Sequence, residues 1–87
     1  MSLSIIDPVF ATKYIGPCQI TLYNSNGTPV TAIDAPEKCE PALKVNDKVI
    51  TIHIYEGCKA EKSHGTFPDG YYIKVSTKGE RYGHIIR

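Results

Sequence analysis

Tryptophan and long apolar runs are both absent from this 87-residue sequence. A helix that crosses a membrane needs about 20 consecutive apolar residues, so the sequence predicts no membrane span. The chain also lacks an excess of charge of one sign, because it has ten Lys and Arg residues and nine Asp and Glu residues. No field of the whole molecule therefore draws the chain toward nucleic acid or an acidic membrane, and any such binding needs a local patch.

Catalytic signatures are missing too. The sequence contains no Gly-rich phosphate loop, no GxSxG nucleophile elbow and no HExxH zinc motif. Asp34, Glu37 and Glu40 are close in sequence, but they are typical of a solvated acidic loop. A chain this short also has little room for a concave substrate site. We therefore expect a protein that is not an enzyme and that needs no cofactor.

Cysteine is scarce: the chain has an odd number of cysteines, widely spaced at Cys18, Cys39 and Cys58. This usage favours reduced thiols in a cell interior; one disulfide with one free thiol is the alternative in an oxidising compartment. Residues 1–8 have no basic leader and only a short apolar run, so they do not predict a secretory signal. The expected location is the cytoplasm.

The candidates for a metal site are four residues with soft or borderline ligand atoms: Cys39, His53, Cys58 and His64. Their spacing fits no standard zinc finger, and a CxxC pair is missing. Cys58 and His64 are also the candidates for a thiol nucleophile and its base, but nothing in the sequence orients the histidine. We expect neither a metal site nor a catalytic thiol.

Six Pro and seven Gly residues divide the chain into short segments. Such punctuation is typical of short strands and tight turns, and a chain of this length builds one modest core. We expect one all-β domain over residues 1–87, a small antiparallel β-barrel or sandwich of six to seven short strands. A closed or nearly closed barrel is favoured, since closure removes exposed strand edges. The Pro-containing segment 34–41 has room for one short helical turn.

Residues 19–33 alternate between polar and apolar on both sides of a turn-rich stretch, which predicts a hairpin. A three-residue loop over 25–27, with Gly27 in the left-handed position, matches the apolar faces of the two strands. This loop pairs Leu22 with Val30 and Ile20 with Ala32, whereas a two-residue loop would place Leu22 opposite Thr31. Pro29 then belongs on an edge strand.

The strongest strand signal covers residues 48–55, where β-branched residues dominate. Ile50, Ile52 and Ile54 all project to one side, so this strand is expected at the centre of the core. Residues 56–70 have few apolar positions and are expected to be the longest and most mobile loop.

Residues 71–86 predict a second hairpin with a three-residue loop over 77–79. On the inner face this register pairs Ile73 with Gly83 and Tyr71 with Ile85. On the outer face it pairs Lys74 with Tyr82 and Tyr72 with His84, with Arg81 and Arg87 nearby. Aromatic and basic side chains on one face can stack bases and hold phosphates, although the same residues also form ordinary solvated sheet surfaces. Thr51, His53 and Tyr55 extend this patch if the central strand lies beside it.

The segment Pro41–Val49 reads PALKVNDKV. It resembles the Leu-Lys-Val-Gly-Asp-Lys-Val run of SH3-like small β-barrels, which include the KOW and Tudor types. Asn46 stands where those sequences usually have Gly, and both residue types tolerate a left-handed turn. The resemblance implies a small barrel that binds nucleic acid or protein peptides.

These patterns favour a non-enzymatic binding module that engages a macromolecular partner through an exposed sheet face and a long loop. A protein partner is preferred, nucleic acid is the alternative, and no membrane is expected. The residues assigned to the binding surface are Tyr72, Lys74, Tyr82, His84, Arg81, His53 and Tyr55. The competing hypothesis is a small inhibitor or accessory protein, of the kind that phages and other mobile elements encode, which blocks a larger enzyme. An unpaired strand edge near Pro29 also allows a homodimer by sheet extension.

Overall fold

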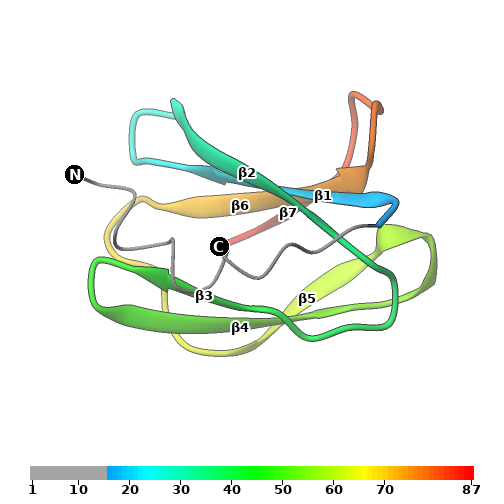
Figure 1. The fold of residues 1–87 in the computed structure, drawn as a ribbon. Coiled ribbons are helices and arrows are strands. Elements are labelled where there is room, and N and C mark those ends of the chain that lie inside the picture. Colours follow the sequence, from blue (N-terminus) through cyan, green and yellow to red (C-terminus); the bar gives the residue numbers. More distant parts are fainter. Residues whose placement is uncertain (1–15) are drawn as a thin grey trace.

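Two antiparallel sheets packed face to face make up the protein, as the computed structural model shows for residues 16–87, which it describes (Figure 1). The four-stranded sheet has the order β2-β1-β6-β7, and the three-stranded sheet has the order β3-β4-β5. The strands are β1 (Cys18–Tyr23), β2 (Pro29–Ala35), β3 (Ala42–Val45), β4 (Lys48–Ile54), β5 (Ala60–His64), β6 (Tyr72–Thr77) and β7 (His84–Ile86). The all-β prediction is confirmed, and of its two alternatives the sandwich is the observed one. The expectation drawn from residues 1–8 lies outside the described residues.

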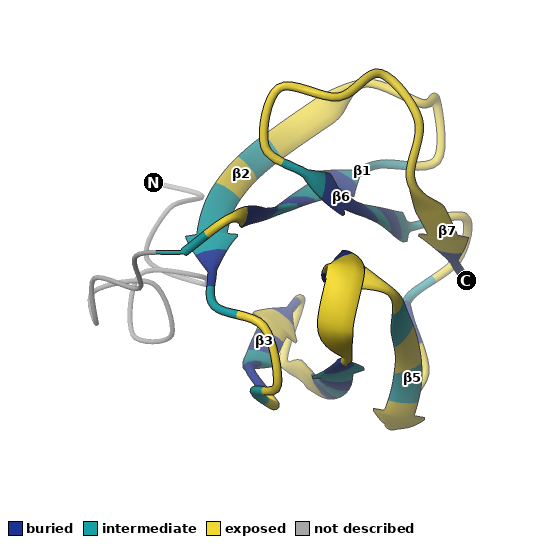
Figure 2. Ribbon diagram, turned by 90° about the vertical axis from the view of Figure 1, so that its right-hand side faces the viewer, coloured by how far each residue is buried: buried dark blue, intermediate teal, exposed yellow. Residues whose placement is uncertain are grey.

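Period-two alternation builds the core between the sheets. Cys18, Ile20 and Leu22 of β1 are buried, while the residues between them are half-buried on the outer side. The predicted central strand is confirmed as β4, since Ile50, Ile52 and Ile54 have no exposed surface. In Figure 2 the buried residues lie within the strands of both sheets, and most residues of the connecting loops are exposed.

The first hairpin has the predicted loop but a different register. Gly27 has φ +80°, and its N–H donates to the carbonyl of Asn24, so the loop over 25–27 is the expected one. The register then shifts by one residue, because Tyr23 pairs with Pro29 and Leu22 pairs with Thr31. Val30 is the extra residue of a bulge, which places Ile33 opposite Ile20. The predicted pairs of Leu22 with Val30 and Ile20 with Ala32 are therefore wrong, whereas the edge position of Pro29 is confirmed.

The last hairpin differs more from its prediction. Its turn forms at the predicted place, where the Glu80 N–H donates to the Thr77 carbonyl and Gly79 has φ +88°. The chain does not return directly into a strand, because residues 80–83 belong to the loop and β7 begins only at His84. The observed pairs are Ile73 with Ile86, Lys74 with Ile85 and Val75 with His84. All four predicted pairs of this hairpin are wrong, since each β6 residue pairs with a residue three positions later in the chain than predicted.

The segment 56–70 is not the long mobile loop that its polarity suggested. It contains η1 (Glu56–Cys58), a single 3-10 turn, and β5, which pairs with β4. The predicted helical turn thus lies here and not in residues 34–41. β5 has no buried residue, and its alternation between half-buried and exposed positions involves polar and small side chains. Apolar patterning could not reveal such an edge strand.

The turn between β3 and β4 matches its expectation. Asn46 has φ +48° and Asp47 has φ +69°, so both central residues are left-handed. A two-residue loop of this kind suits the twist of the flanking strands. Asn46 therefore adopts the left-handed conformation that glycine usually supplies at such positions.

A disulfide between Cys18 and Cys58 contradicts the expectation of reduced thiols. The bond joins β1 of one sheet to η1 at the end of the other, and both residues are buried. Cys39 is the free cysteine among the described residues; its Sγ donates to the Pro36 carbonyl, and partial burial raises the pKa of its thiol. Of the two arrangements that the cysteine count allowed, one bridge with one free thiol is the observed one.

Within residues 16–87 no helix has the length and apolar character that a membrane crossing requires.

Candidate functional site

The outer face of the four-stranded sheet carries a row of large side chains at one register. Tyr23 of β1 pairs with Pro29 on one side and with Tyr72 of β6 on the other. Ile73 pairs with Ile86, so Arg87 follows beside Tyr72. Directly paired residues share a face of a sheet, and this row therefore runs across all four strands. We call Tyr23, Tyr72 and Arg87 the tyrosine row.

The tyrosine row is a stack. The rings of Tyr23 and Tyr72 have centroids 5.0 Å apart with an angle of 11° between their planes. The Arg87 guanidinium lies 5.4 Å from the centroid of the Tyr72 ring, and the Lys74 ammonium lies 6.0 Å from that of Tyr23. Both faces of the Tyr72 ring are thus occupied, because its cross-strand neighbours lie on opposite sides of it. The row offers cationic groups, ring edges and phenol hydroxyls, and it leaves no free face of Tyr72 for a flat ligand.

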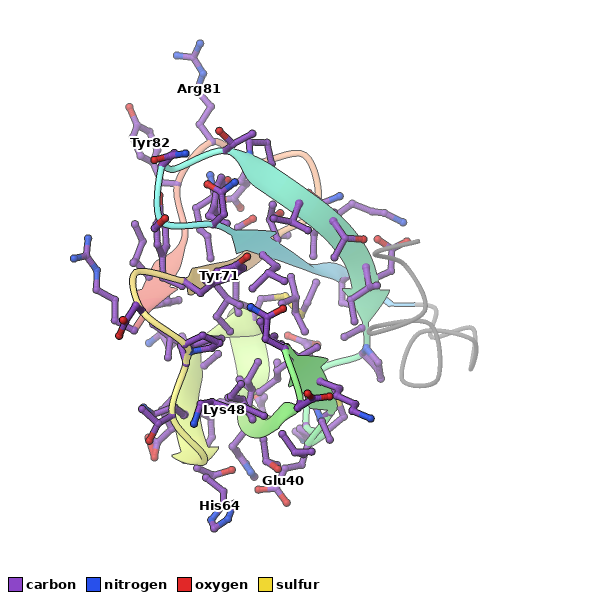
Figure 3. All side chains as sticks on the ribbon, turned by 90° about the vertical axis from the view of Figure 1, so that its left-hand side faces the viewer. Glu40, Lys48, His64, Tyr71, Arg81 and Tyr82 are labelled. Carbon is purple, nitrogen blue, oxygen red and sulfur yellow. A yellow bond between two sulfur atoms is a disulfide. The ribbon has the colours of Figure 1, made fainter. Side chains whose placement is uncertain are left out.

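The next row toward the β6–β7 loop brings an apolar side chain beside a cation. Lys74 pairs with Thr21 and with Ile85, and Ile85 is 53% exposed. The Lys74 Nζ also donates to the Arg81 carbonyl at 3.4 Å, which connects the loop to the sheet. Tyr82, the residue after Arg81, is 81% exposed. Figure 3 shows Arg81 and Tyr82 projecting from this side of the sandwich.

A hollow of about 660 Å³ opens at one end of the sandwich, where the tyrosine row ends. Its walls come from the β1–β2 turn, from the segment 66–71 and from the cationic residues Lys62 of β5 and Arg87. Figure 3 looks onto this end, and Tyr71 lies there between the two sheets. Gly70 lies so close to Ser25 that a Cβ at this position would meet the Ser25 backbone at 2.9 Å. The lining residues are Ser25, Asn26, Gly27, Lys62, Thr66, Phe67, Pro68, Asp69, Gly70, Tyr71, Tyr72 and Arg87.

Cations at this site have no carboxylate partner within residues 16–87. The ion pairs of that part of the chain are Lys38 with Glu56, His53 with Glu40, and Lys78 with Asp34. Lys62, Lys74 and Arg87 are in none of them. The Lys62 ammonium lies 6.0 Å from the centroid of the Phe67 ring, so its contact there is with an aromatic face. Asp69 is the one acidic residue among those that line the hollow.

The structure divides the seven predicted binding residues between two sides of the molecule. Tyr72 and Lys74 lie on the outer face of β6, as predicted, and the β6–β7 loop places Arg81 and Tyr82 at its border. His84 is not beside Tyr72. It lies on the edge strand β7, where it pairs with Val75 of β6. His53 and Tyr55 do not extend the patch, since they belong to β4 and its end in the other sheet.

On that other sheet His53 and Tyr55 form a separate pair. Their ring centroids are 4.3 Å apart, and the His53 Nδ1 lies 3.5 Å from the Glu40 carboxylate. Desolvation beside the sheet, followed by the negative charges of Glu61 and Glu40, raises the pKa of the Tyr55 hydroxyl. In Figure 3, Glu40 lies at the bottom of the view and Arg81 at the top, which shows how far apart the two faces are.

Tyr23 and Lys62 are site residues that the sequence did not identify. Tyr23 follows the outward alternation of Gln19 and Thr21 on β1, so its side was readable from the sequence. Its position beside Tyr72 depends on the pairing of β1 with β6, strands about 50 residues apart, which no local pattern reveals. Lys62 lies on β5, a strand without an apolar signal.

No group of three or more His, Cys, Asp or Glu side chains is placed to hold a metal ion in the part of the chain that the structure describes. Of the four candidate ligands, Cys58 is bound in the disulfide with Cys18. The same bond removes Cys58 as a thiol nucleophile. No protein-family model matches the chain, and no curated protein matches it.

Proposed function

We propose that the protein is a non-enzymatic binding module that engages a protein partner through the outer face of its four-stranded sheet. The observation that carries this proposal is the tyrosine row, with Lys74 and the exposed Ile85 beside it. Tyr and Arg are the residue types that most often dominate the energy of protein interfaces. Here the two Tyr residues stand on paired strands and the Arg87 guanidinium lies over the Tyr72 ring, so little side-chain freedom remains to be lost on binding.

Exposed apolar side chains favour a protein over nucleic acid as the partner. Ile85 and Tyr82 lie beside the cations, and an aliphatic side chain adds little to the grip on a phosphate backbone. Base stacking needs free aromatic faces. Both faces of the Tyr72 ring are taken by Tyr23 and Arg87, so this ring does not serve as a stacking platform.

Paired substitutions on the two outer faces test the proposal. In the test variant Tyr82→Ser and Ile85→Ser are combined, and in the matched control Tyr55→Ser and Val49→Ser are combined. Each pair removes one exposed Tyr and one exposed aliphatic side chain; in the control, Val49 lies on β4 of the three-stranded sheet and Tyr55 directly follows that strand. Surface substitutions of this kind change folding stability by about 0.5 kcal/mol or less, so both variants should stay folded.

The expected result is that a partner captured from the source lysate is lost with the test variant and kept with the control. The loss should be about tenfold or more in affinity if these side chains are central contacts. Equal capture by both variants would show that this face is not used. Capture that disappears after nuclease treatment, or that weakens steeply with salt, would identify nucleic acid as the ligand instead.

The disulfide bears on where such a module acts. The cytoplasmic location was expected from residues 1–8 and from a cysteine usage that favours reduced thiols. The disulfide removes the second of these grounds, since disulfides persist mainly in oxidising compartments. We propose that the module binds with the Cys18–Cys58 bond formed. A cytoplasmic module would have to bind equally well with both thiols reduced, and capture with and without a reductant separates the two cases.

A further inference from the structure

We propose that the hollow beside the tyrosine row receives an acidic side chain from a peptide segment of the partner, with its carboxylate between Lys62 and Arg87. This inference rests on the proposed function and names the chemistry of the partner. Its starting point is that two cations from different sheets line one hollow with a single acidic residue, Asp69, among its lining.

Each cation is held in place by an aromatic ring. The Lys62 side chain is half-buried on β5 with its ammonium over the Phe67 ring, and the Arg87 guanidinium lies over the Tyr72 ring. Strands β5 and β7 contact each other across the sandwich, which brings the two residues to the same end. Cations that are already oriented lose little freedom when they bind an anion, so more of the interaction appears as affinity.

The charges favour an anion in the hollow. Lys62 and Arg87 form no ion pair within residues 16–87, and two like charges that line one hollow repel each other. A carboxylate between them removes this repulsion and accepts charge-assisted hydrogen bonds, and Arg can bind it through two parallel N–H groups. The volume of about 660 Å³ lies within the range of sites that hold small ligands, so one side chain and part of its backbone fit.

Neutral groups around the cations suit a peptide. Ser25 and Thr66 supply hydroxyls, Asn26 supplies an amide, and Tyr71 and Tyr72 supply phenol groups. These groups can pair with peptide N–H and carbonyl groups on both sides of the acidic residue. From the hollow, a bound chain can continue past Arg87 toward the exposed Ile85 in the next row, whereas a nucleotide would find both faces of the Tyr72 ring covered.

The test uses a short fluorescent peptide of alternating Glu and Ser, its counterpart with Gln in place of Glu, and a labelled single-stranded oligothymidylate of equal charge. Binding to the full chain is measured by fluorescence anisotropy, and the site is mapped from amide shifts in NMR spectra. The expected result is binding of the Glu peptide, with shifts at Lys62, Asn26, Gly70 and Arg87, and weak or no binding of the Gln peptide. The oligothymidylate should bind more weakly than the Glu peptide.

Charge reversal identifies the residues responsible. Lys62→Glu and Arg87→Glu should each lower the affinity for the Glu peptide by about tenfold, as expected for the loss of a charge-assisted hydrogen bond. Lys59→Glu is the matched control, since it reverses an exposed Lys just before β5, away from the lining of the hollow. Lys62→Gln and Arg87→Gln serve as second variants that remove the charge alone, and a thermal melt checks that each variant folds.

Three results would overturn the inference: unchanged Glu-peptide binding by the folded Lys62 and Arg87 variants, an equal effect of Lys59→Glu, or tighter binding of the oligothymidylate. The proposed function fails separately. If Tyr82→Ser with Ile85→Ser abolishes capture of the partner while Lys62→Glu leaves it intact, the face binds a protein but the hollow does not hold its carboxylate.

Discussion

Gly83 lies where the β6–β7 loop crosses the outer face of the four-stranded sheet. A Cβ at this position would be 2.6 Å from the Ser76 Cβ and would also clash with the Val75 carbonyl oxygen. Ser76 is buried although it belongs to the outer face, because this loop covers it. The single missing side chain thus allows the loop to approach and to hold Arg81 against Lys74.

Gly83→Ala should therefore destabilise the fold by about 2 kcal/mol, the usual size of an overpacking penalty. Gly57→Ala is the control for glycine replacement itself, since Gly57 has φ +74° but no atom within 4 Å of its Cβ position. Gly57→Ala should lower the folding stability by about 1 kcal/mol through backbone strain alone. Chemical denaturation of both variants measures the difference, and a Gly83 variant as stable as the Gly57 variant would show that the loop does not lie against the sheet.

At the scale of elements, the sequence predicted the strands whose apolar residues alternate. β1, β4 and β6 were found with the correct inward residues, and Tyr72 and Lys74 were placed on the outer face for the same reason. The predicted registers of both hairpins were wrong, because the bulge at Val30 and the extra residues 80–83 leave no mark in local propensity. β5 was missed because an edge strand can pair through its backbone with little apolar surface of its own.

The strand β5 has a direct test in amide hydrogen exchange. Its pairing with β4 should protect about half of the amides of Ala60–His64, those that donate to β4, while the remainder face solvent at the edge of the sheet. The loop amide of Ser25 provides the internal reference, since this residue is exposed, whereas the neighbouring Asn26 N–H donates to the Asn24 side chain. Uniformly fast exchange across 60–64, at the rate of that loop, would restore the interpretation of a mobile loop and would remove Lys62 from a fixed place at the hollow.

For the molecule as a whole, the relative placement of the two sheets decides the geometry of the site. Arg87 follows a strand of the four-stranded sheet and Lys62 belongs to the three-stranded one, so the hollow depends on how the sheets pack. The apolar core between them and the Cys18–Cys58 bond are the features that fix this packing. A chain of this size buries a modest core, which makes a covalent link between the sheets important.

Removing the disulfide should consequently weaken both the fold and the proposed peptide site. The bond joins residues 40 positions apart, and loop-closure entropy for such a separation corresponds to about 4 kcal/mol. For a domain of this size that is a fall in Tm of roughly 15 to 30 °C. The measurement compares wild type with Cys18→Ala combined with Cys58→Ala, both carrying Cys39→Ala so that thiol exchange cannot contribute. A variant that melts within a few degrees of wild type would mean that the core alone holds the sheets together. If that variant is folded at the assay temperature yet binds the Glu peptide more weakly than wild type, the bond acts on the distance between Lys62 and Arg87 as well as on stability.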